Sequence, residues 1–334
     1  MYGGFNQIGR TGLLRIPAAV NQAITAIQPH VTKLHSEYLL ATLNFRVGYW
    51  KEVASSSRKD PNITSQDVRA FPISVPTLTE QRVIAQVLSN VDGLLGKLDA
   101  LIAKKRDLKQ ATMQQLLTGL TRLPGFDGDW ELRTLGSVVA NLEAGVSVNS
   151  IEYGRPLGSG KPCILKTSAI FGGRFDPEEC KLIDQRDLSR ARVSPRRDTI
   201  IISRMNTPNL VGEVGYVAAD FPTLCLPDRL WITRFASGSD ICARWLAYIM
   251  SSAQIKETIK SLATGTSGTM KNIGKSALLA LQLRFPSGAE QKAITTILSD
   301  MDAELAALEA RRDKTRALKQ GMMQELLTGR IRLV

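Results

Sequence analysis

The sequence has few of the residues that most metal and redox sites require. Among its 334 residues are only two histidines, His30 and His35, and four cysteines, spread from Cys163 to Cys242 without a CxxC spacing. Histidine and cysteine are the usual zinc ligands, and closely spaced cysteines are typical of a disulfide framework. The composition therefore argues against both kinds of site, and we expect the cysteines to be small buried side chains.

Long apolar runs are lacking as well. The sequence contains no run of about 18 apolar residues, which a membrane-spanning helix would need. Its first ten residues lack the charged start and the apolar stretch of a signal peptide. We therefore expect a cytoplasmic protein that does not bind a membrane.

The motifs of common enzymes are also missing. There is no GxGxxG, HExxH or GxSxG motif, and no Asp/Asn-Pro-Pro-aromatic tetrapeptide of the kind with which DNA amino-methyltransferases hold a flipped base. Residues 268–276 resemble a P-loop, but five residues instead of four separate Gly268 from the Gly-Lys-Ser that follows. The sequence therefore predicts a binding protein with neither a catalytic residue nor a cofactor.

Positive charge is in clear excess. Lysine and arginine number 43 against 31 acidic residues, which gives a formal net charge of +12 and an isoelectric point near 9.7. This balance favours an acidic polyanion as partner, and nucleic acid first, although an anionic membrane or an acidic protein would also be attracted. The length predicts two domains, and 43% hydrophobic residues suffice for ordinary cores.

A long internal repeat organises the chain. Residues 80–119 align without a gap on residues 290–329 at an offset of 210, with 20 of 40 positions identical. Weaker similarity continues upstream, where Asn62-Ile63 matches Asn272-Ile273, residues 38–40 resemble 245–247, and residues 8–12 resemble 211–215. Each copy is therefore expected to hold the end of a domain together with one long helix.

The repeated segments have the apolar spacing of a coiled coil. Steps of three and four residues predict a heptad seam. In the first copy the seam positions are Ile84, Val87, Val91, Leu94, Leu98, Leu101 and Leu108, and in the second copy they are Ile294, Ile297, Met301, Leu308 and Leu318, with Leu298 and Leu305 widening the stripe. We expect the two helices, each about 60 Å long, to pair antiparallel. The alternative is a coiled coil with another molecule.

Between the helices the pattern changes to short apolar runs broken by Gly, Pro and Ser, which predict strands. Such runs occur at residues 163–165, 199–202, 215–217 and 230–232, and β-like runs at 71–76 and 281–286 precede the helices. The fold class is therefore α+β. Its expected parts are the end of a first domain (1–76), a helix (77–119), a second domain (120–286) and a second helix (287–330). The second copy has 137 residues between Trp130 and Ser267 and the first has 56 before Ser57, a difference of about 80, so we expect a shortened first domain.

Two segments of the second domain carry side chains suited to DNA. Residues 203–209 follow an apolar strand and combine Arg, Asn and Thr, and arginine can bind guanine while asparagine can bind adenine. An ordinary polar turn would have the same composition. Residues 264–272 form a Gly/Thr loop ending in Lys and Asn, which could grip a phosphate or serve as a linker. The candidate DNA-binding residues are Lys166, Thr167, Ser168, Arg174, Arg204, Asn206, Thr207, Asn209, Thr266, Ser267, Lys271, Asn272, Arg10, Arg58 and Lys59.

The helix ends carry a family resemblance. Both helices open in Pro-x-x-x-Glu-Gln (76–81 and 286–291) and close in Leu-Leu-Thr-Gly (116–119 and 326–329). In this the chain resembles the DNA-specificity subunits of type I restriction-modification systems. The resemblance implies two target-recognition domains, joined by two antiparallel spacer helices, that read a bipartite site on double-stranded DNA. It also implies two methyltransferase subunits that methylate adenine, and ATP-dependent restriction subunits that translocate and cut DNA.

Three readings of the function remain at this point. The first is a non-catalytic specificity subunit that reads a bipartite site. The second is a scaffold that recruits methyltransferase subunits through its helices but reads one half-site or none. The third, an enzyme in its own right, is disfavoured by the missing motifs. The DNA target itself cannot be deduced from the sequence.

Overall fold

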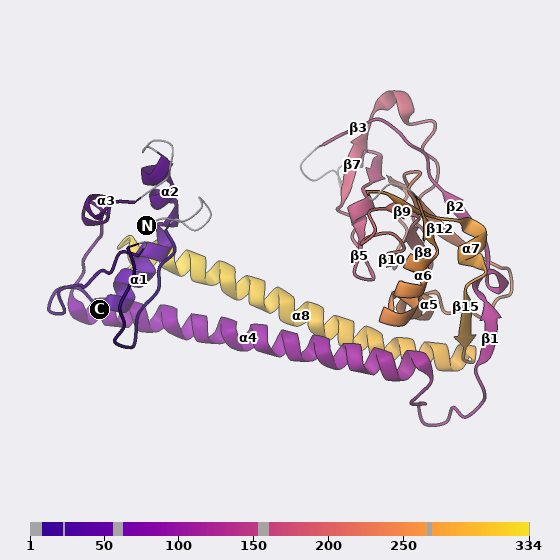
Figure 1. The fold of residues 1–334 in the computed structure, drawn as a ribbon, viewed down its shortest axis with the longest axis horizontal. Coiled ribbons are helices and arrows are strands. Elements are labelled where there is room, and N and C mark those ends of the chain that lie inside the picture. Colours follow the sequence, from indigo (N-terminus) through magenta and orange to yellow (C-terminus); the bar gives the residue numbers. More distant parts are fainter. Residues whose placement is uncertain (1–8, 23, 56–62, 153–159, 266–268, 334) are drawn as a thin grey trace. The chain divides into compact units, whose positions relative to one another are not determined.

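The computed structural model describes residues 9–22, 24–55, 63–152, 160–265 and 269–333. The chain divides into two compact units. Unit 1 comprises Met1–Lys105 and Glu304–Val334, and unit 2 comprises Arg106–Ala303. Two long helices, α4 (Leu78–Thr118) and α8 (Gly288–Leu327), contribute to both units (Figure 1).

Both long helices begin and end with the same local signals. Thr77 and Ser287 precede them, and the hydroxyl oxygen of each accepts a hydrogen bond from a backbone N–H in the first turn, that of Glu80 or Glu290, at 3.3 Å. Each helix is followed by a glycine of positive φ, Gly119 at 73° and Gly329 at 74°, a conformation that glycine adopts without strain. The predicted helices are confirmed, with both starting two residues earlier than the aligned repeat.

The helices pair antiparallel in each unit, as predicted. In unit 1 the Nζ atom of Lys319 lies 2.6 Å from a carboxylate oxygen of Asp92, and in unit 2 Lys109 lies 2.6 Å from Asp302. These two pairs are related by the offset of 210. Each therefore joins the first half of one helix to the second half of the other.

In each unit a buried glutamate at the start of one long helix binds an arginine that follows the other long helix. Arg332 donates two hydrogen bonds, of 2.7 and 2.6 Å, to buried Glu80 in unit 1, and Arg122 donates two of 2.7 Å to buried Glu290 in unit 2. The hydrogen bonds from Arg332 lower the pKa of Glu80. Glu80 therefore stays charged at the positive end of α4, where an anion is favoured.

The predicted seam is correct at some positions and wrong at others. Ile84, Leu98 and Ile294 are buried, but Leu94, Leu101, Leu108, Ile297 and Leu318 are exposed. Leu298 and Leu305, predicted to widen the stripe, are buried, and Leu88 and Ile102 of α4, which the heptads did not include, are buried as well. Adjacent helix positions point about 100° apart, so the seam is rotated by roughly one residue where neighbouring positions are both apolar. Lys105 also reaches across to Glu304, 2.6 Å away.

Unit 2 is an α+β domain (Figure 1). Its main sheet has the order β10-β8-β12-β2 and is antiparallel throughout. The strands are β2 (Val139–Ala144), β8 (Thr199–Ser203), β10 (Val214–Val217) and β12 (Leu230–Phe235). Ile200 and Ile202 belong to one core cluster and Ile201 to another. Strand β8 is therefore buried on both faces, which explains its unbroken apolar run.

Four smaller sheets complete unit 2. One has the order β11-β4-β7-β3, another β13-β14-β9, and the pairs β1-β15 and β5-β6 are antiparallel. The bounds are β1 (Glu131–Thr134), β3 (Ser150–Ile151), β4 (Cys163–Leu165), β5 (Ile170–Phe171), β6 (Arg174–Phe175), β7 (Cys180–Ile183), β9 (Met205–Asn206), β11 (Leu224–Cys225), β13 (Ala263–Thr264), β14 (Lys271–Ile273) and β15 (Gln282–Phe285). The four predicted strands of this domain are confirmed as β4, β8, β10 and β12.

Short helices link these sheets to the long helices. They are α5 (Ala243–Ser251), α6 (Ala253–Ser261) and α7 (Lys275–Leu279), with single 3₁₀ turns at Leu135–Ser137, Thr167–Ala169 and Gln185–Asp187. Buried Trp245 and Leu246 of α5 share a core cluster with Ile200 of β8 and Ile294 of α8. The domain is thus fixed to the long helices by a continuous apolar core.

Unit 1 is helical where it is described. Helix α1 (Ser36–Phe45) packs against the start of α4 and the end of α8, and helices α2 (Val47–Ser55) and α3 (Ser65–Arg69) share a second cluster with α1. The predicted β-like run at 71–76 is not a paired strand, because no described segment of unit 1 forms a backbone ladder with it. Its carbonyl oxygens at Pro72 and Ser74 accept hydrogen bonds from the side chains of Arg46 and Tyr38 instead. Its counterpart at 281–286 is confirmed as β15.

The two units repeat each other in detail. Helices α1, α2 and α3 correspond to α5, α6 and α7, at offsets of 207 for α1 and 210 for α3. Gln81 accepts a hydrogen bond from the backbone N–H of His35, and Gln291 accepts one from Cys242. Gly9 and Gly212 both have positive φ. A Cβ atom on Gly9 would lie within 3 Å of the Trp50 side chain of α2, and one on Gly212 within 3 Å of the Ile259 side chain of α6. The duplication therefore extends well upstream of the long helices.

Among the described residues, no helix is long and apolar enough to cross a membrane. The four cysteines are free; Cys163, Cys180 and Cys225 are buried as predicted, whereas Cys242 is half-buried. Burial raises the pKa of the Cys180 thiol to about 12. Burial also raises the pKa of Cys163 and Cys225, so these three buried thiols are inert packing groups.

The rotated seam predicts unequal effects for two leucines of α4. Leu88→Ala removes a buried side chain of unit 1 and should lower the free energy of unfolding by about 2–5 kcal/mol. Leu94→Ala, six residues along the same helix, removes an exposed side chain and should change it by less than about 0.5 kcal/mol. Urea unfolding followed by circular dichroism measures both. A larger loss for Leu94→Ala would restore the seam predicted from the heptads.

Candidate functional site

The fold brings the two predicted DNA-binding segments together. Strand β9 lies within the first segment and β14 begins at the end of the second, and the two strands pair antiparallel. In this register Lys271 faces Asn206 and Asn272 faces Met205. The backbone N–H of Ile273 also donates to the carbonyl oxygen of Arg204 at 2.9 Å. The segments thus form one surface in unit 2, although about 60 residues separate them in the sequence.

We name this surface the turn face, and it consists of Arg204, Thr207, Asn209, Lys271 and Asn272. Thr207, Asn209 and Asn272 are exposed, whereas Arg204 and Lys271 are half-buried. Residues 207–211 form a tight turn in which the carbonyl oxygen of Thr207 accepts hydrogen bonds from the backbone N–H groups of Leu210 and Val211. Donors and acceptors therefore cluster on a rigid turn beside a sheet.

Arg204 is held in a particular way at this surface. Its guanidinium carbon lies 5.6 Å from the ring centroid of Trp231, a buried residue of β12. Its Nε atom is buried and has no hydrogen-bond partner among the described residues. A guanidinium stacked on an aromatic ring loses little further freedom when its outer nitrogens bind a ligand.

Asn206 lies within the same segment but is buried. Its side-chain amide donates to the hydroxyl oxygen of Ser203 at 3.2 Å, and its side-chain oxygen accepts from the backbone N–H of Thr207 at 2.9 Å. Both ends of this side chain therefore brace the turn, and the geometry favours a structural role for Asn206.

The remaining candidates of unit 2 lie on or before the β5-β6 hairpin. Lys166 lies 3.5 Å from Glu152 and 3.9 Å from Glu179, and the hydroxyl of Ser168 donates to Glu179 at 2.7 Å. Thr167 is half-buried and Arg174 is exposed at the end of the hairpin turn. Hydrogen bonds from Lys181 and the charge of Lys166 lower the pKa of Glu152, which therefore neutralises part of the local positive charge.

A buried carboxylate joins the hairpin to the turn face. Glu213 follows the turn, is 3% exposed, and forms an ion pair with Lys256 of α6. Its Oε2 atom accepts a hydrogen bond of 3.0 Å from the backbone N–H of Gly172, in the hairpin turn. Removing one member of such a buried pair leaves an unpaired buried charge, which is unfavourable. Through its contacts with Gly172 and Lys256, Glu213 therefore holds the hairpin and the turn face in fixed positions relative to each other.

Five candidates fall elsewhere. Thr266, Ser267, Arg58 and Lys59 lie outside the described residues. Arg10 is exposed and belongs to unit 1.

Sequence reasoning missed two aromatic residues of unit 2. The sequence predicts Trp231 only as a strand residue, whereas in the structure the guanidinium group of Arg204 lies over its ring. Phe171, at the start of the hairpin turn, is 66% exposed beside Gly172, Gly173 and Arg174. The Phe-Gly-Gly-Arg sequence is a signal for an exposed aromatic tip, because two glycines of positive φ favour a tight hairpin turn.

Comparison with known proteins finds similarity to one group of proteins. Residues 4–104 match the model of the type I restriction modification DNA specificity domain. The type I restriction enzyme MjaVIII specificity subunit of Methanocaldococcus jannaschii is 25% identical over 311 residues, which cover 89% of this chain and 70% of that protein. The putative MjaX specificity subunit of the same organism is 26% identical over 330 residues, 92% of this chain and 71% of that protein. The chain is thus similar to type I specificity subunits over most of its length.

Solved structures agree with the fold described above. The type I restriction-modification S subunit from M. genitalium is 16% identical, with a TM-score of 0.59 over 89% of this chain and 74% of that one. A chain from a structure on the assembly and conformational transition of the type I system is 18% identical, with a TM-score of 0.51 over 90% and 73%. The predicted fold class, α+β domains with two long antiparallel helices, is confirmed.

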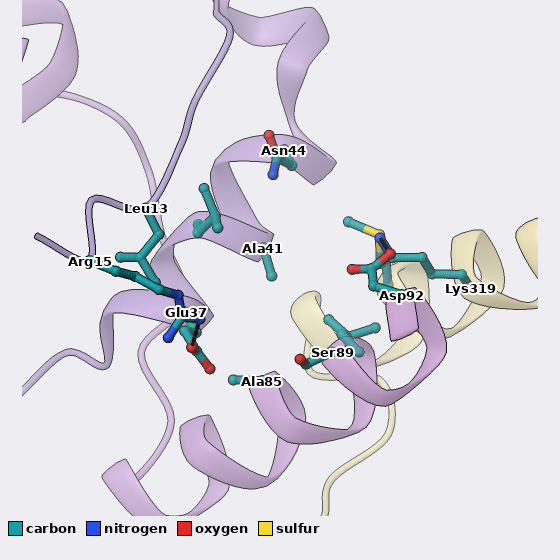
Figure 2. Close-up of a pocket in the computed structure, with 12 residues that line it drawn as sticks. Leu13, Arg15, Glu37, Ala41, Asn44, Ala85, Ser89, Asp92 and Lys319 are labelled. Carbon is teal, nitrogen blue, oxygen red and sulfur yellow. Dashed lines mark hydrogen bonds and ion pairs between the residues drawn. The ribbon is translucent and has the colours of Figure 1, made fainter. Parts of the chain in front are cut away.

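A cavity in unit 1 marks one place where the two units differ. It encloses about 310 Å³ between α1, α4, α8 and the segment before α1, and its lining includes Leu13, Ala41, Ser89, Asp92 and Lys319 (Figure 2). At the offset of α1 and α5, Ala41 corresponds to Tyr248 of unit 2. The cavity therefore lies where unit 2 has a tyrosine side chain.

Tyr248 shows what the missing side chain does. Its hydroxyl donates to Asp302 at 2.6 Å, and Lys109 lies 5.4 Å from the centre of its ring. Burial and the neighbouring Asp302 raise the pKa of Tyr248 to about 12, so the hydroxyl remains a donor. Asp92 and Lys319 repeat Asp302 and Lys109 in unit 1, but they face the small side chain of Ala41 (Figure 2).

This comparison predicts a stabilising substitution. Ala41→Tyr should fill the cavity and supply a donor to Asp92, raising the free energy of unfolding by about 0.5–2 kcal/mol, a gain typical of cavity filling. Ala41→Phe supplies the ring without the hydroxyl and serves as the control, with a smaller gain. Thermal unfolding measures both variants, and a lower melting temperature for Ala41→Tyr would show that the two sites are not equivalent.

Proposed function

We propose that this chain is the DNA-specificity subunit of a type I restriction-modification complex and that unit 2 reads part of a bipartite site through the turn face. In this proposal it has no catalytic activity, and it positions two methyltransferase subunits for adenine methylation. Restriction subunits, which translocate and cut DNA with ATP, complete the assembly. The homology to specificity subunits supports the DNA-specificity role, and the geometry of unit 2 supports the choice of residues.

The observation that carries the proposal is Arg204 on the ring of Trp231. Arginine is suited to guanine because two of its nitrogens can donate to O6 and N7 in the major groove. Stacking orients the guanidinium plane before DNA arrives, and the buried Nε leaves the two outer nitrogens to make this contact. Thr207, Asn209 and Asn272 supply further donors and acceptors on the same surface.

Much of the positive charge of unit 2 is already paired within it. Arg186 lies 2.8 Å from Asp184, Arg190 lies 2.9 Å from Asp187, and Lys181 lies 2.8 Å from Glu152. Because a neighbouring carboxylate offsets each of these positive charges, unit 2 attracts the phosphates of DNA less strongly than its number of basic residues suggests. Phosphate contacts position a protein on DNA, whereas contacts with base edges select the sequence. We therefore assign selection to the turn face and general affinity to the excess charge of the chain.

The long helices supply the proposed surface for the partner subunits. Leu94, Leu101 and Leu318 are exposed in unit 1, because other apolar residues of the helices form the buried contacts between them. Exposed leucines along helices are suited to packing against the helices of another protein. The same helices would set the spacing between the two half-sites.

A scaffold is the second candidate function. The described residues of unit 1 contain no sheet, and of the predicted DNA-binding residues only Arg10 is described there. A chain in which unit 1 binds no bases would still hold its partner subunits through the helices. Mapping methylated adenines in DNA modified by the assembled complex separates the two: a bipartite consensus supports the specificity subunit, and a single half-site supports the scaffold.

Arg204 provides the direct test. In the complex with its methyltransferase subunits, Arg204→Ala should weaken binding to the selected duplex by roughly tenfold to hundredfold, corresponding to about 1–3 kcal/mol for one bidentate base contact. Arg204→Lys keeps the charge but loses the fork of donors, so it should recover binding without recovering selectivity. Fluorescence anisotropy with the selected duplex and a scrambled duplex, at several salt concentrations, measures this.

Arg186→Ala is the matched control, because Arg186 is exposed and paired with its neighbour Asp184. It should lower affinity for both duplexes equally and by less than Arg204→Ala. Circular dichroism of each variant checks that the fold is retained. If Arg204→Ala affects the scrambled duplex as strongly as the selected one, Arg204 contacts phosphate and the assignment of base reading to the turn face is wrong.

A further inference from the structure

The β5-β6 hairpin of unit 2 presents an aromatic side chain to solvent at its tip. Phe171 and Arg174 face each other across the hairpin, and Gly172 and Gly173 between them have φ values of 59° and 78°. Positive φ at both central residues is the geometry of a type I′ turn, which makes a tight hairpin. Phe171 is 66% exposed. The ring therefore lies at a narrow tip and is followed directly by two glycines.

The hairpin has one buried side and one exposed side. Ile170 is 1% exposed and belongs to a core cluster, and Phe175, which faces it in the register, is half-buried against the same cluster. Directly opposed residues of an antiparallel pair point to the same side, and consecutive residues point to opposite sides. Phe171 and Arg174, both exposed, therefore share the solvent side of the hairpin.

The backbone of this tip is held against the rest of unit 2. Buried Glu213 accepts the hydrogen bond of the Gly172 N–H at 3.0 Å. A Cβ atom on Gly173 would lie 2.9 Å from the Oγ atom of Ser251 in α5, and one on Gly215 in β10 would lie 3.0 Å from a backbone carbonyl oxygen of the hairpin. Because the backbone is packed this closely on α5 and β10, the exposed ring has a firm support.

Backbone hydrogen bonds also join Glu213 to the start of the turn face. The N–H of Ser203 donates to the carbonyl oxygen of Glu213 at 2.8 Å, and the N–H of Gly212 donates to the carbonyl oxygen of Ser203 at 2.8 Å. Arg204 of the turn face follows Ser203 directly. The carboxylate that holds the hairpin thus belongs to a residue bonded to the neighbour of Arg204. A ligand as long as a DNA duplex, bound at the turn face, can therefore reach the tip.

We infer that Phe171 is a wedge that enters between two neighbouring base pairs of the DNA bound at the turn face. The inference rests on the proposed function and adds a second means of selection to it. Proteins that kink DNA insert single apolar side chains, phenylalanine among them, between base pairs. Pyrimidine–purine steps are the most easily unstacked. Phe171 therefore favours a deformable base step, while Arg204 contacts base edges.

The shape and charge of the tip favour DNA over a protein as its partner. A stable protein interface buries about 800 Å² on each partner and surrounds its central aromatic residue with other side chains. Here two glycines follow the ring, and its neighbour on the exposed side is the cationic Arg174. A single ring beside a positive charge is suited to a base step flanked by phosphates. Arg174 is placed to bind such a phosphate when the ring is inserted.

The test uses the complex with its methyltransferase subunits and the duplex that it selects. The fluorescent base 2-aminopurine, which brightens when it is unstacked, replaces one base at a time. The adenines that become methylated are left out, because a methyltransferase extrudes its target base. We expect brightening at one base step, and a bend of about 20–90° measured by energy transfer between the labelled duplex ends. Both should be lost in Phe171→Ala.

Further variants separate wedging from general binding. Phe171→Trp keeps a flat aromatic ring and should retain the brightening and the bend. Leu132→Ala is the matched control, because it removes another apolar side chain of unit 2, 61% exposed on β1, and it should leave both unchanged. Phe171→Ala should also weaken binding of the selected duplex by roughly fivefold to hundredfold, the range expected when one base loses an aromatic partner. Circular dichroism checks that each variant is folded.

The inference is overturned if the complex binds one duplex selectively but no position brightens, or if the brightening and the bend persist in Phe171→Ala. In both cases the proposed function stands, because selective binding has been observed. If Phe171→Ala fails to assemble with the methyltransferase subunits in the absence of DNA, as measured by sedimentation, the tip is a protein contact and the inference is again wrong. If no duplex is selected at all, the proposed function fails together with the inference.

Discussion

A buried carboxylate at the first turn of each long helix determines how the rest of the chain is arranged. Glu80 and Glu290 are each bound by two nitrogens of an arginine that follows the other helix. Bidentate geometry fixes distance and orientation together, so each pair sets the register of α4 against α8 in its own unit. The neighbouring glutamines, Gln81 and Gln291, then bind the backbone just before α1 and α5. The attached helices are thereby fixed to the same turn.

The large elements could be predicted from the sequence because they depend on local or repeated signals. The repeat located both long helices within two residues, and glycine at their ends marked where they stop. The seam could not be placed as well. Leu94 and Leu95 are adjacent, as are Leu101 and Ile102, and only the partner helix decides which of two neighbouring apolar residues becomes buried.

The candidate site shows a different limit. Residues near 204 and near 271 were each recognised as possible DNA contacts, but their pairing through β9 and β14 is non-local and leaves no mark in either segment. Asn206 has the same sequence signal as an exposed asparagine in a turn. Its hydrogen bonds to Ser203 and Thr207 become visible only when the turn is folded. Trp231 was likewise predicted as a strand residue, while its role as support for Arg204 depends on the neighbouring strand.

The contact of Glu213 with both Gly172 and Lys256 has an evolutionary consequence. The hairpin and the turn face share one buried charge, so a change in the length of either loop would disturb the geometry of the other. Single substitutions could adjust an individual exposed residue such as Asn209. A wholly new binding preference would be acquired more readily by exchanging residues 152–272 as one block, which keeps the ion pairs of Glu213 with Lys256 and of Glu152 with Lys181, than by accumulating changes one loop at a time.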